Sequence, residues 1–360
     1  MPRGPGTCRR GHRHEAADVP RRSTHAVEGR RTMTSLSRRH FLAASGAMLA
    51  APMLARAETY PSRPVSIVVA FAPGGSLDMI ARRIATHMAA ELGVPFVVEN
   101  RSGAGGRIGT QHVAKARGDG YTLIATSSAA HGVAPSLYPQ AELGYRAMED
   151  FSHIGLICKG PMALMVRADA PFDNAAELVA YSKSTGKPLF YGSGGIGSLG
   201  HLTGNLIGNT LGIPVEHVSY RGSAPAQADL LAGNLTAVCD NMSSHTAQFS
   251  AGAIKIIGLT AGERFSKMPT AATFAEQGYP QLQAAAWYGL SGSGGMPPAV
   301  VQKLNASLKR FLVQPDTIEL LAGLSMVADD GMPADTYSRF VESELAKWGK
   351  VIRDSDIKVS

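Results

Sequence analysis

Apolar and polar positions in the first third of the chain follow two alternating periods. Short runs rich in Val and Ile, at residues 65–71, 95–100 and 121–128, have the length and composition of buried strands. Between the first two, residues 79–93 carry apolar side chains at helical spacing and close on Gly93. This strand–helix alternation predicts a mostly parallel sheet with helices on both faces.

The alternation restarts after a long apolar stretch at residues 153–169. We therefore expect an α/β fold of two lobes joined by two crossing strands, one near 155–165 and a return near 280–290. Two amphipathic helical patterns close the chain. The predicted division is a leader at 1–57, lobe 1 at 58–160 plus 284–360, and lobe 2 at 161–283.

The N-terminal segment has the layout of an export signal. Residues 33–42 contain the pair Arg38-Arg39 followed by Phe-Leu, and a weakly apolar stretch leads to the small-residue site Ala55-Arg56-Ala57. That stretch, residues 41–54, is shorter than the roughly 20 residues that span a bilayer. We interpret residues 1–32 as an over-long start and 33–57 as a twin-arginine signal peptide, which predicts a periplasmic protein.

The leader also explains the basic charge. Eleven of the 35 basic residues and three of the 28 acidic residues lie in 1–57, so the remainder carries a net charge of −1. This balance argues against nucleic acid as a partner. Cys158 and Cys239 lack metal-ligand spacing, so no metal is expected. They either pair in an oxidising compartment or, as their apolar neighbours favour, remain buried thiols.

Two glycine-rich corners between a strand and a helix carry the candidate chemistry. Residues 71–78 read FAPGGSLD, and residues 192–198 read GSGGIGS. Free N–H groups at helix starts favour an anion, and glycine lets a ligand approach the backbone closely. Asp78 does not fit a simple anion site: it either caps its helix or faces a cationic group or bridging water.

A nicotinamide-dependent oxidoreductase is the rival interpretation of the second corner. Residues 192–197 match GxGxxG, and Glu216 follows at about the distance of a ribose-binding acid. However, Glu216 sits inside a strand pattern, and no partner for hydride chemistry stands out. The sequence also lacks a P-loop, a GxSxG elbow and an HExxH motif. Trp287 and Tyr288 either wall a cleft or pack the core.

Motifs spread over residues 58–360 resemble those of one family. They include YPSRP at 60–64, VVENRSGAGG at 97–106, YRGSAPA at 220–226 and WYG at 287–289, together with FAPGGSLD. The chain is similar to the Bug family, the periplasmic solute-binding receptors of tripartite tricarboxylate transporters. The resemblance implies a type II periplasmic-binding-protein fold that closes like a clamshell on a small carboxylate, without catalysis or cofactor.

The same resemblance implies a monomer that delivers its ligand to integral membrane transporter subunits; a ligand-sensing receptor for a signalling partner is the alternative. Carried over residue by residue, it also implies the ligand-binding set. That set is Phe71, Pro73, Gly74, Gly75, Ser76, Asp78, Thr126, Ser127, Ser128, Ser193, Gly194, Gly195, Gly197, Ser198, His201, Asp240, Asn241 and Trp287. The chain departs from the family pattern at Ile196, Leu199, Cys239 and His131, so the resemblance does not identify the ligand.

Overall fold

The computed structural model describes residues 60–355 and residue 357. The chain divides into two units, residues 1–57 and 58–360, and every described residue belongs to the second. The predicted over-long start and twin-arginine signal lie outside the described residues. None of the helices within the described part is long and apolar enough to cross a membrane.

The first α/β layer is built on three parallel strands in the order β2-β1-β3, extended by β9 and β4, which run antiparallel to their neighbours. Its strands are β1 (Val65–Val69), β2 (Phe96–Asn100), β3 (Thr122–Ser127), β9 (Ala285–Ser293) and the short β10 (Val327–Ala328). Its helices are α2 (Ser76–Leu92), α3 (Arg107–Ala114), α4 (Ala134–Leu137), α5 (Gln140–Leu143), α10 (Pro298–Leu312), α11 (Pro315–Gly323) and α12 (Ala334–Asp354).

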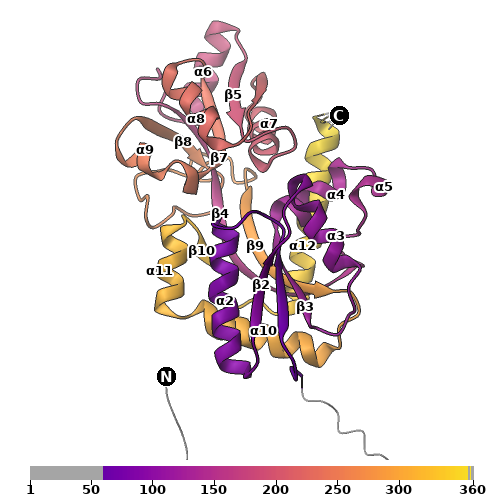
Figure 1. The fold of residues 1–360 in the computed structure, drawn as a ribbon. Coiled ribbons are helices and arrows are strands. Elements are labelled where there is room, and N and C mark those ends of the chain that lie inside the picture. The colour runs from indigo at the N-terminus through magenta and orange to yellow at the C-terminus, as the bar shows by residue number, and fades with distance from the viewer. Residues whose placement is uncertain (1–59, 356, 358–360) are drawn as a thin grey trace, which may run out of the picture. The chain divides into compact units, whose positions relative to one another are not determined.

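The 17-residue strand β4 (Phe151–Arg167) connects this layer to a second one (Figure 1). Up to Pro161 it pairs with β9, and from Met162 it pairs with β7 and β8. The second layer holds strands β5 (Leu189–Ser193), β6 (Val215–Ser219), β7 (Ala237–Asn241) and β8 (Ile254–Leu259) and helices α6 (Ala175–Thr185), α7 (Leu199–Leu211), α8 (Ser223–Ala232) and α9 (Thr246–Ser250).

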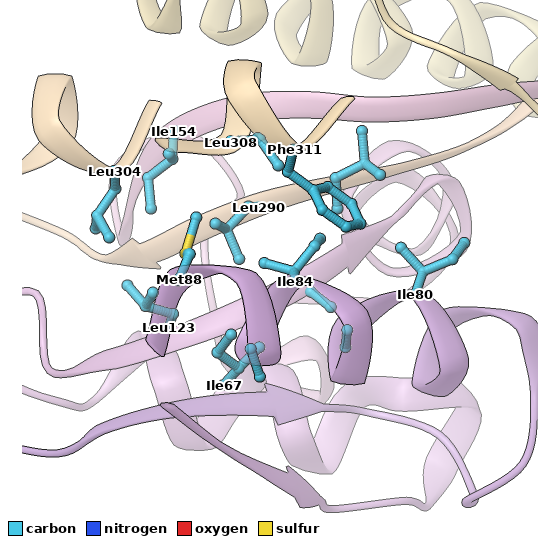
Figure 2. Packing of buried hydrophobic residues seen from close by; sticks show 14 of the residues in the cluster. Ile67, Ile80, Ile84, Met88, Leu123, Ile154, Leu290, Leu304, Leu308 and Phe311 are labelled. Carbon is cyan, nitrogen blue, oxygen red and sulfur yellow. The ribbon is translucent and has the colours of Figure 1, made fainter. Parts of the chain in front are cut away.

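Each layer has its own apolar core. In the first, α2 places Ile80, Ile84 and Met88 at four-residue spacing, so they share one helix face. Figure 2 shows these side chains meeting Leu308 and Phe311 of α10 above the sheet. A fully buried aliphatic or aromatic side chain contributes about 1.5–3 kcal/mol to folding. The packing of α2 against α10 and the sheet therefore fixes where the N-terminus of α2 lies.

The predicted strand–helix order is present, but three features differ. Both corner helices begin three residues earlier than the pattern indicated, at Ser76 and Leu199. Residues 128–133 form an unpredicted π-helix, η3 (Ser128–Val133). The short helices α4, α5, α9 and α11 and the strand β10 were also not predicted, because segments of two to nine residues show too little periodicity.

Cys158 and Cys239 are both buried and free, as their apolar neighbours indicated. They belong to the cores of different layers. Burial raises the pKa of both thiols, so both stay protonated at neutral pH.

Candidate functional site

A cavity of about 360 Å³ lies where the ends of strands from both layers meet helix N-termini. This is the position at which open α/β sheets bind ligands. Ten of the predicted residues line it: Phe71, Gly75, Ser76, Asp78, Ser127, Ser128, Gly194, Ser198, Asp240 and Asn241. The lining also includes eight residues outside the predicted ligand-binding set: Ala72, Leu77, Ala129, Met162, Leu199, Gly200, Ala286 and Tyr288.

The first corner offers an uncapped helix start. Gly75 is the N-cap of α2, and no side chain at this cap accepts a hydrogen bond from the helix. The first helical N–H groups, those of Ser76 and Leu77, belong to residues that line the cavity. Unpaired N–H groups at a helix start, together with the helix dipole, favour a negatively charged group.

Asp78 holds this corner together. Its carboxylate accepts the N–H of Gly74 (2.9 Å), the side-chain amide of Asn100 (2.9 Å) and Nε of Arg82 (3.0 Å). The predicted capping role is not present, because the carboxylate bonds a backbone N–H before the helix and none in its first turn. The carboxylate does pair with a cation. The cation is Arg82 of the same helix, so the charge of Asp78 is compensated within the protein.

The bonds from Arg82, Gly74 and Asn100 lower the pKa of Asp78 to about 2, against the opposing effect of burial. Asp78 is therefore ionised throughout the physiological range. Gly74, with φ of +86°, and the exposed Pro73 shape the turn but lie outside the cavity lining.

The cavity floor comes from the end of β3 and the start of η3. Ser127 caps η3 by accepting the N–H of Ala130 (3.3 Å), and Ser128 and Ala129 follow it in the lining. Thr126 does not line the cavity. Its hydroxyl is buried and bonds the Tyr337 hydroxyl at 2.7 Å, because alternate residues of a strand face opposite ways.

The second corner lies at the start of α7, which unlike α2 is capped by a side chain, that of Ser198. Gly194 and the N-cap Ser198 line the cavity, while Gly195 and Gly197 adopt positive φ angles of +136° and +74° that shape the loop between them. Ser193 and His201 are buried just behind the lining. Gly200 permits the close approach of α7 to β7, since a Cβ there would lie 2.3 Å from the Cys239 carbonyl oxygen.

Comparison of the sequence with protein families shows which proteins have this cavity between two glycine-rich corners. The family model described as "Tripartite tricarboxylate transporter family receptor" matches residues 80–357. The chain belongs to this receptor family. The prediction of a solute-binding receptor is thereby confirmed, and the oxidoreductase alternative is not favoured. Consistent with this, Glu216 lies exposed inside β6 rather than at the end of a strand.

Three similar proteins support the assignment. BugT of Bordetella pertussis is 32% identical over 320 residues, covering 89% of this chain and 96% of BugT. MatC of Rhodopseudomonas palustris, solved with bound malate, is 32% identical with a TM-score of 0.67, over 81% of this chain and 100% of MatC. A second R. palustris protein, solved with adipate, is 32% identical with a TM-score of 0.69, over 83% and 99% of the two chains. These likenesses confirm the two-lobed α/β periplasmic-binding-protein fold.

In this receptor β4 and β9, the two strands that connect the lobes, contribute Met162, Ala286 and Tyr288 to the cavity. Trp287, the predicted residue, is wholly buried on the other side of β9, where its Nε1 donates to Glu344 at 3.0 Å. The sequence pattern left open whether either aromatic residue walls a cleft, and the family resemblance implied Trp287 and not Tyr288. The alternation of a strand would have allowed only one of them to face the cleft.

Asp240 and Asn241, at the end of β7, complete the receptor's cavity. Asp240 bonds the Asn241 N–H (2.8 Å) and faces Nε2 of the buried His245 (3.2 Å). Asn241 caps the short helix η4 (Met242–Ser244) through the Ser243 N–H (2.8 Å). Both side chains thus have partners within the protein and shape the cavity wall.

The lining contains no lysine, arginine or histidine. Its charged residues are Asp78 and Asp240, and both have donors in the protein. An anion in this cavity would therefore meet backbone N–H groups and hydroxyls instead of a cationic side chain. Within the described residues, no group of three His, Cys, Asp or Glu side chains is placed to hold a metal ion.

Proposed function

We propose that this receptor captures a small carboxylate between its two lobes and delivers it to a membrane transporter. The uncapped start of α2 carries the proposal, because it presents free N–H groups and the Ser76 hydroxyl to a cavity that lacks cations. The malate and adipate bound in two similar receptors support the same ligand class.

The cavity favours a ligand with acid groups at its ends and an apolar body. Polar groups lie at the two helix starts, from Ser76 on one side and Ser198 on the other. Between them the wall is largely apolar, with Phe71, Leu77, Leu199, Met162 and Tyr288 in the lining. Such a surface suits the methylene chain of a dicarboxylate.

Ligand capture would work by closure of the lobes around β4 and β9. We assign lobe 1 to residues 58–160 plus 284–360 and lobe 2 to 161–283; β4 changes partners between Pro161 and Met162, one residue beyond this boundary. A ligand that contacts both lobes stabilises the closed form relative to the open one. The closed monomer would then be the form that the transporter subunits recognise.

Thermal unfolding and calorimetry with matched ligands test the binding function. We expect malate or adipate to raise the melting temperature of the protein lacking residues 1–57, and the corresponding diamides to have no effect. A stronger response to a neutral or cationic compound than to any carboxylate would refute the proposal.

The periplasmic destination is proposed to be reached through the twin-arginine pathway, on the strength of Arg38-Arg39 and the following apolar stretch. The double substitution Arg38→Lys with Arg39→Lys should leave the full-length precursor in the cytoplasm. Arg56→Lys, in the same signal peptide but outside the arginine pair, is the control and should not block export. Undiminished export of the variant changed at positions 38 and 39 would show that another pathway is used.

A further inference from the structure

Two imidazole rings stand behind the second corner. His201 of α7 and His217 of β6 stack with ring centroids 3.9 Å apart and an interplanar angle of 16°. Neither ring belongs to the cavity lining. The other titratable ring against His217 is that of Tyr191, at 5.2 Å between centroids.

Hydrogen bonds connect this pair to the loop. Ser193 Oγ lies 2.7 Å from Nε2 of His217, 3.0 Å from Ser198 Oγ and 3.4 Å from the Gly195 N–H. Nδ1 of His201 accepts the Gly197 N–H at 3.1 Å. The backbone on both sides of Ile196, and the N-cap of α7, are thereby attached to the two rings.

Two arrangements of protons satisfy the network, because either Ser193 Oγ or Nε2 of His217 can be the donor between them. In the first, His217 accepts. The Gly195 N–H and the Ser198 hydroxyl donate to Ser193 Oγ, which leaves the Ser193 hydroxyl to donate to His217. Ser198 Oγ then accepts the His201 N–H at 3.2 Å, as the N-cap of α7. In this arrangement His217 is the terminal acceptor and carries no proton at Nε2. In the other, the Nε2–H of His217 donates to Ser193 Oγ, the Ser193 hydroxyl donates to Ser198 Oγ or to the Gly195 carbonyl oxygen, and the Ser198 hydroxyl is left to face the cavity.

We propose that His217 is a positioning residue for ligand binding: by its hydrogen bond to the Ser193 hydroxyl and its stacking on His201, it fixes the loop that presents Gly194 and Ser198 to the cavity. Without it, the Ser193 hydroxyl has Ser198 Oγ, 3.0 Å away, and the Gly195 carbonyl oxygen, 3.3 Å away, as its remaining acceptors. Burial and the neighbouring His201 lower the pKa of His217 to about 4, which keeps the ring neutral at neutral pH.

Two variants separate the hydrogen bond from the ring stack. His217→Phe keeps an aromatic ring on His201 and removes the nitrogen that bonds Ser193, while His217→Gln places an amide group where Nε2 lies. The role in binding rests on the proposed function, so malate and adipate are the probes. We expect His217→Phe to weaken their binding about five- to tenfold, the size of one lost hydrogen bond, and His217→Gln to stay within about twofold of wild type. The exposed His112 provides the control substitution to Phe.

A double-mutant cycle identifies the route of the effect. Ser193→Ala should weaken binding as His217→Phe does, and His217→Phe should add nothing in that background. Hydrogen exchange of the ligand-free protein is the second measurement: amides at 194–198 should exchange faster in His217→Phe but not in His217→Gln.

Two results would overturn the role of His217. One is that amides 194–198 of His217→Phe exchange at the wild-type rate, and the other is that the losses of affinity in Ser193→Ala and His217→Phe add in the double variant. If no carboxylate binds the wild-type protein, the proposed function fails, but the exchange measurement still decides whether His217 positions the loop.

Discussion

Asp78 and Arg82 pair one helical turn apart on α2, with Arg82 Nε 3.0 Å from Asp78 Oδ2. The same carboxylate also accepts donors from Gly74 and Asn100. One buried group therefore joins α2, the turn before it and the end of β2. The first corner keeps its shape through this carboxylate, while the N–H groups at the helix start remain free for a ligand.

We expect Asp78→Asn to lower the free energy of unfolding by about 2 kcal/mol, because charge-assisted bonds to Arg82 and Gly74 are lost in a buried place. Asp335→Asn is the matched control: it breaks an exposed pair with Arg339 at the same i,i+4 spacing, and should change stability by less than about 0.5 kcal/mol. Urea unfolding at pH 7 measures both. Equal effects of the two substitutions would contradict the structural role of Asp78.

The stabilisation by Asp78 should depend on pH in a defined window. Its pKa is about 2 in the folded protein and near the ordinary value of about 3.9 in the unfolded chain. A lowered folded pKa stabilises fully above the unfolded pKa, and this stabilisation is lost as the pH falls toward the folded pKa. The stability difference between wild type and Asp78→Asn should stay constant from pH 7 to 5 and fall to about half at pH 3. A constant difference down to pH 3 would contradict the lowered pKa.

Ser76→Ala should weaken carboxylate binding by roughly 1–3 kcal/mol, if the hydroxyl at the start of α2 donates to the ligand. Ser343→Ala, on the exposed side of α12, is the control for a lost serine hydroxyl. Calorimetry of both variants tests this, and unchanged affinity in Ser76→Ala would remove that hydroxyl from the site.

Two adjacent glycines allow a side chain that would block the ligand to be compared with one that would strain the backbone. Gly75 has φ of −76°, and a Cβ there would meet only the Ala72 carbonyl oxygen, at 3.9 Å. Gly74 has φ of +86°, which strains any other residue. We expect Gly75→Val to lower ligand affinity with little loss of melting temperature, and Gly74→Val to lower the melting temperature. The reverse result would show that Gly75 is structural.

We expect Trp287 to contribute to stability and its neighbour Tyr288 to contribute to ligand binding. Trp287→Phe removes a buried bond to Glu344, so we expect a loss of about 1–2 kcal/mol in unfolding free energy with affinity retained. Tyr288→Ala opens the cavity wall and should lower affinity instead. Paired unfolding and binding measurements separate the two effects, and a larger affinity loss in Trp287→Phe would contradict this division.

The sequence predicted the order of strands and helices well because long apolar runs and helical repeats report burial directly. The 17-residue strand β4 appeared as one apolar stretch, and α10 and α12 appeared as amphipathic repeats. Both glycine corners were also located correctly at strand ends. Glycines and small polar residues between a strand pattern and a helix pattern clearly indicate a turn.

The side-chain directions at the site could not be predicted as well. Thr126 and Trp287 were carried over from the family resemblance, and the phase of their strands turns them away from the cavity. The pairing of His201 with His217 had no local signal, because the two residues lie on different elements that the fold brings together. Tertiary contacts of this kind are absent from periodicity and motif spacing.

A delivery protein must release its ligand as well as bind it. A binding site built around an arginine or lysine would be left with an unpaired, partly desolvated charge whenever the ligand departed, and that state is high in free energy. The lining of this cavity contains no such side chain. After the anion leaves, backbone N–H groups and serine hydroxyls can bond water at once, so handing the ligand to the transporter requires no replacement counter-ion.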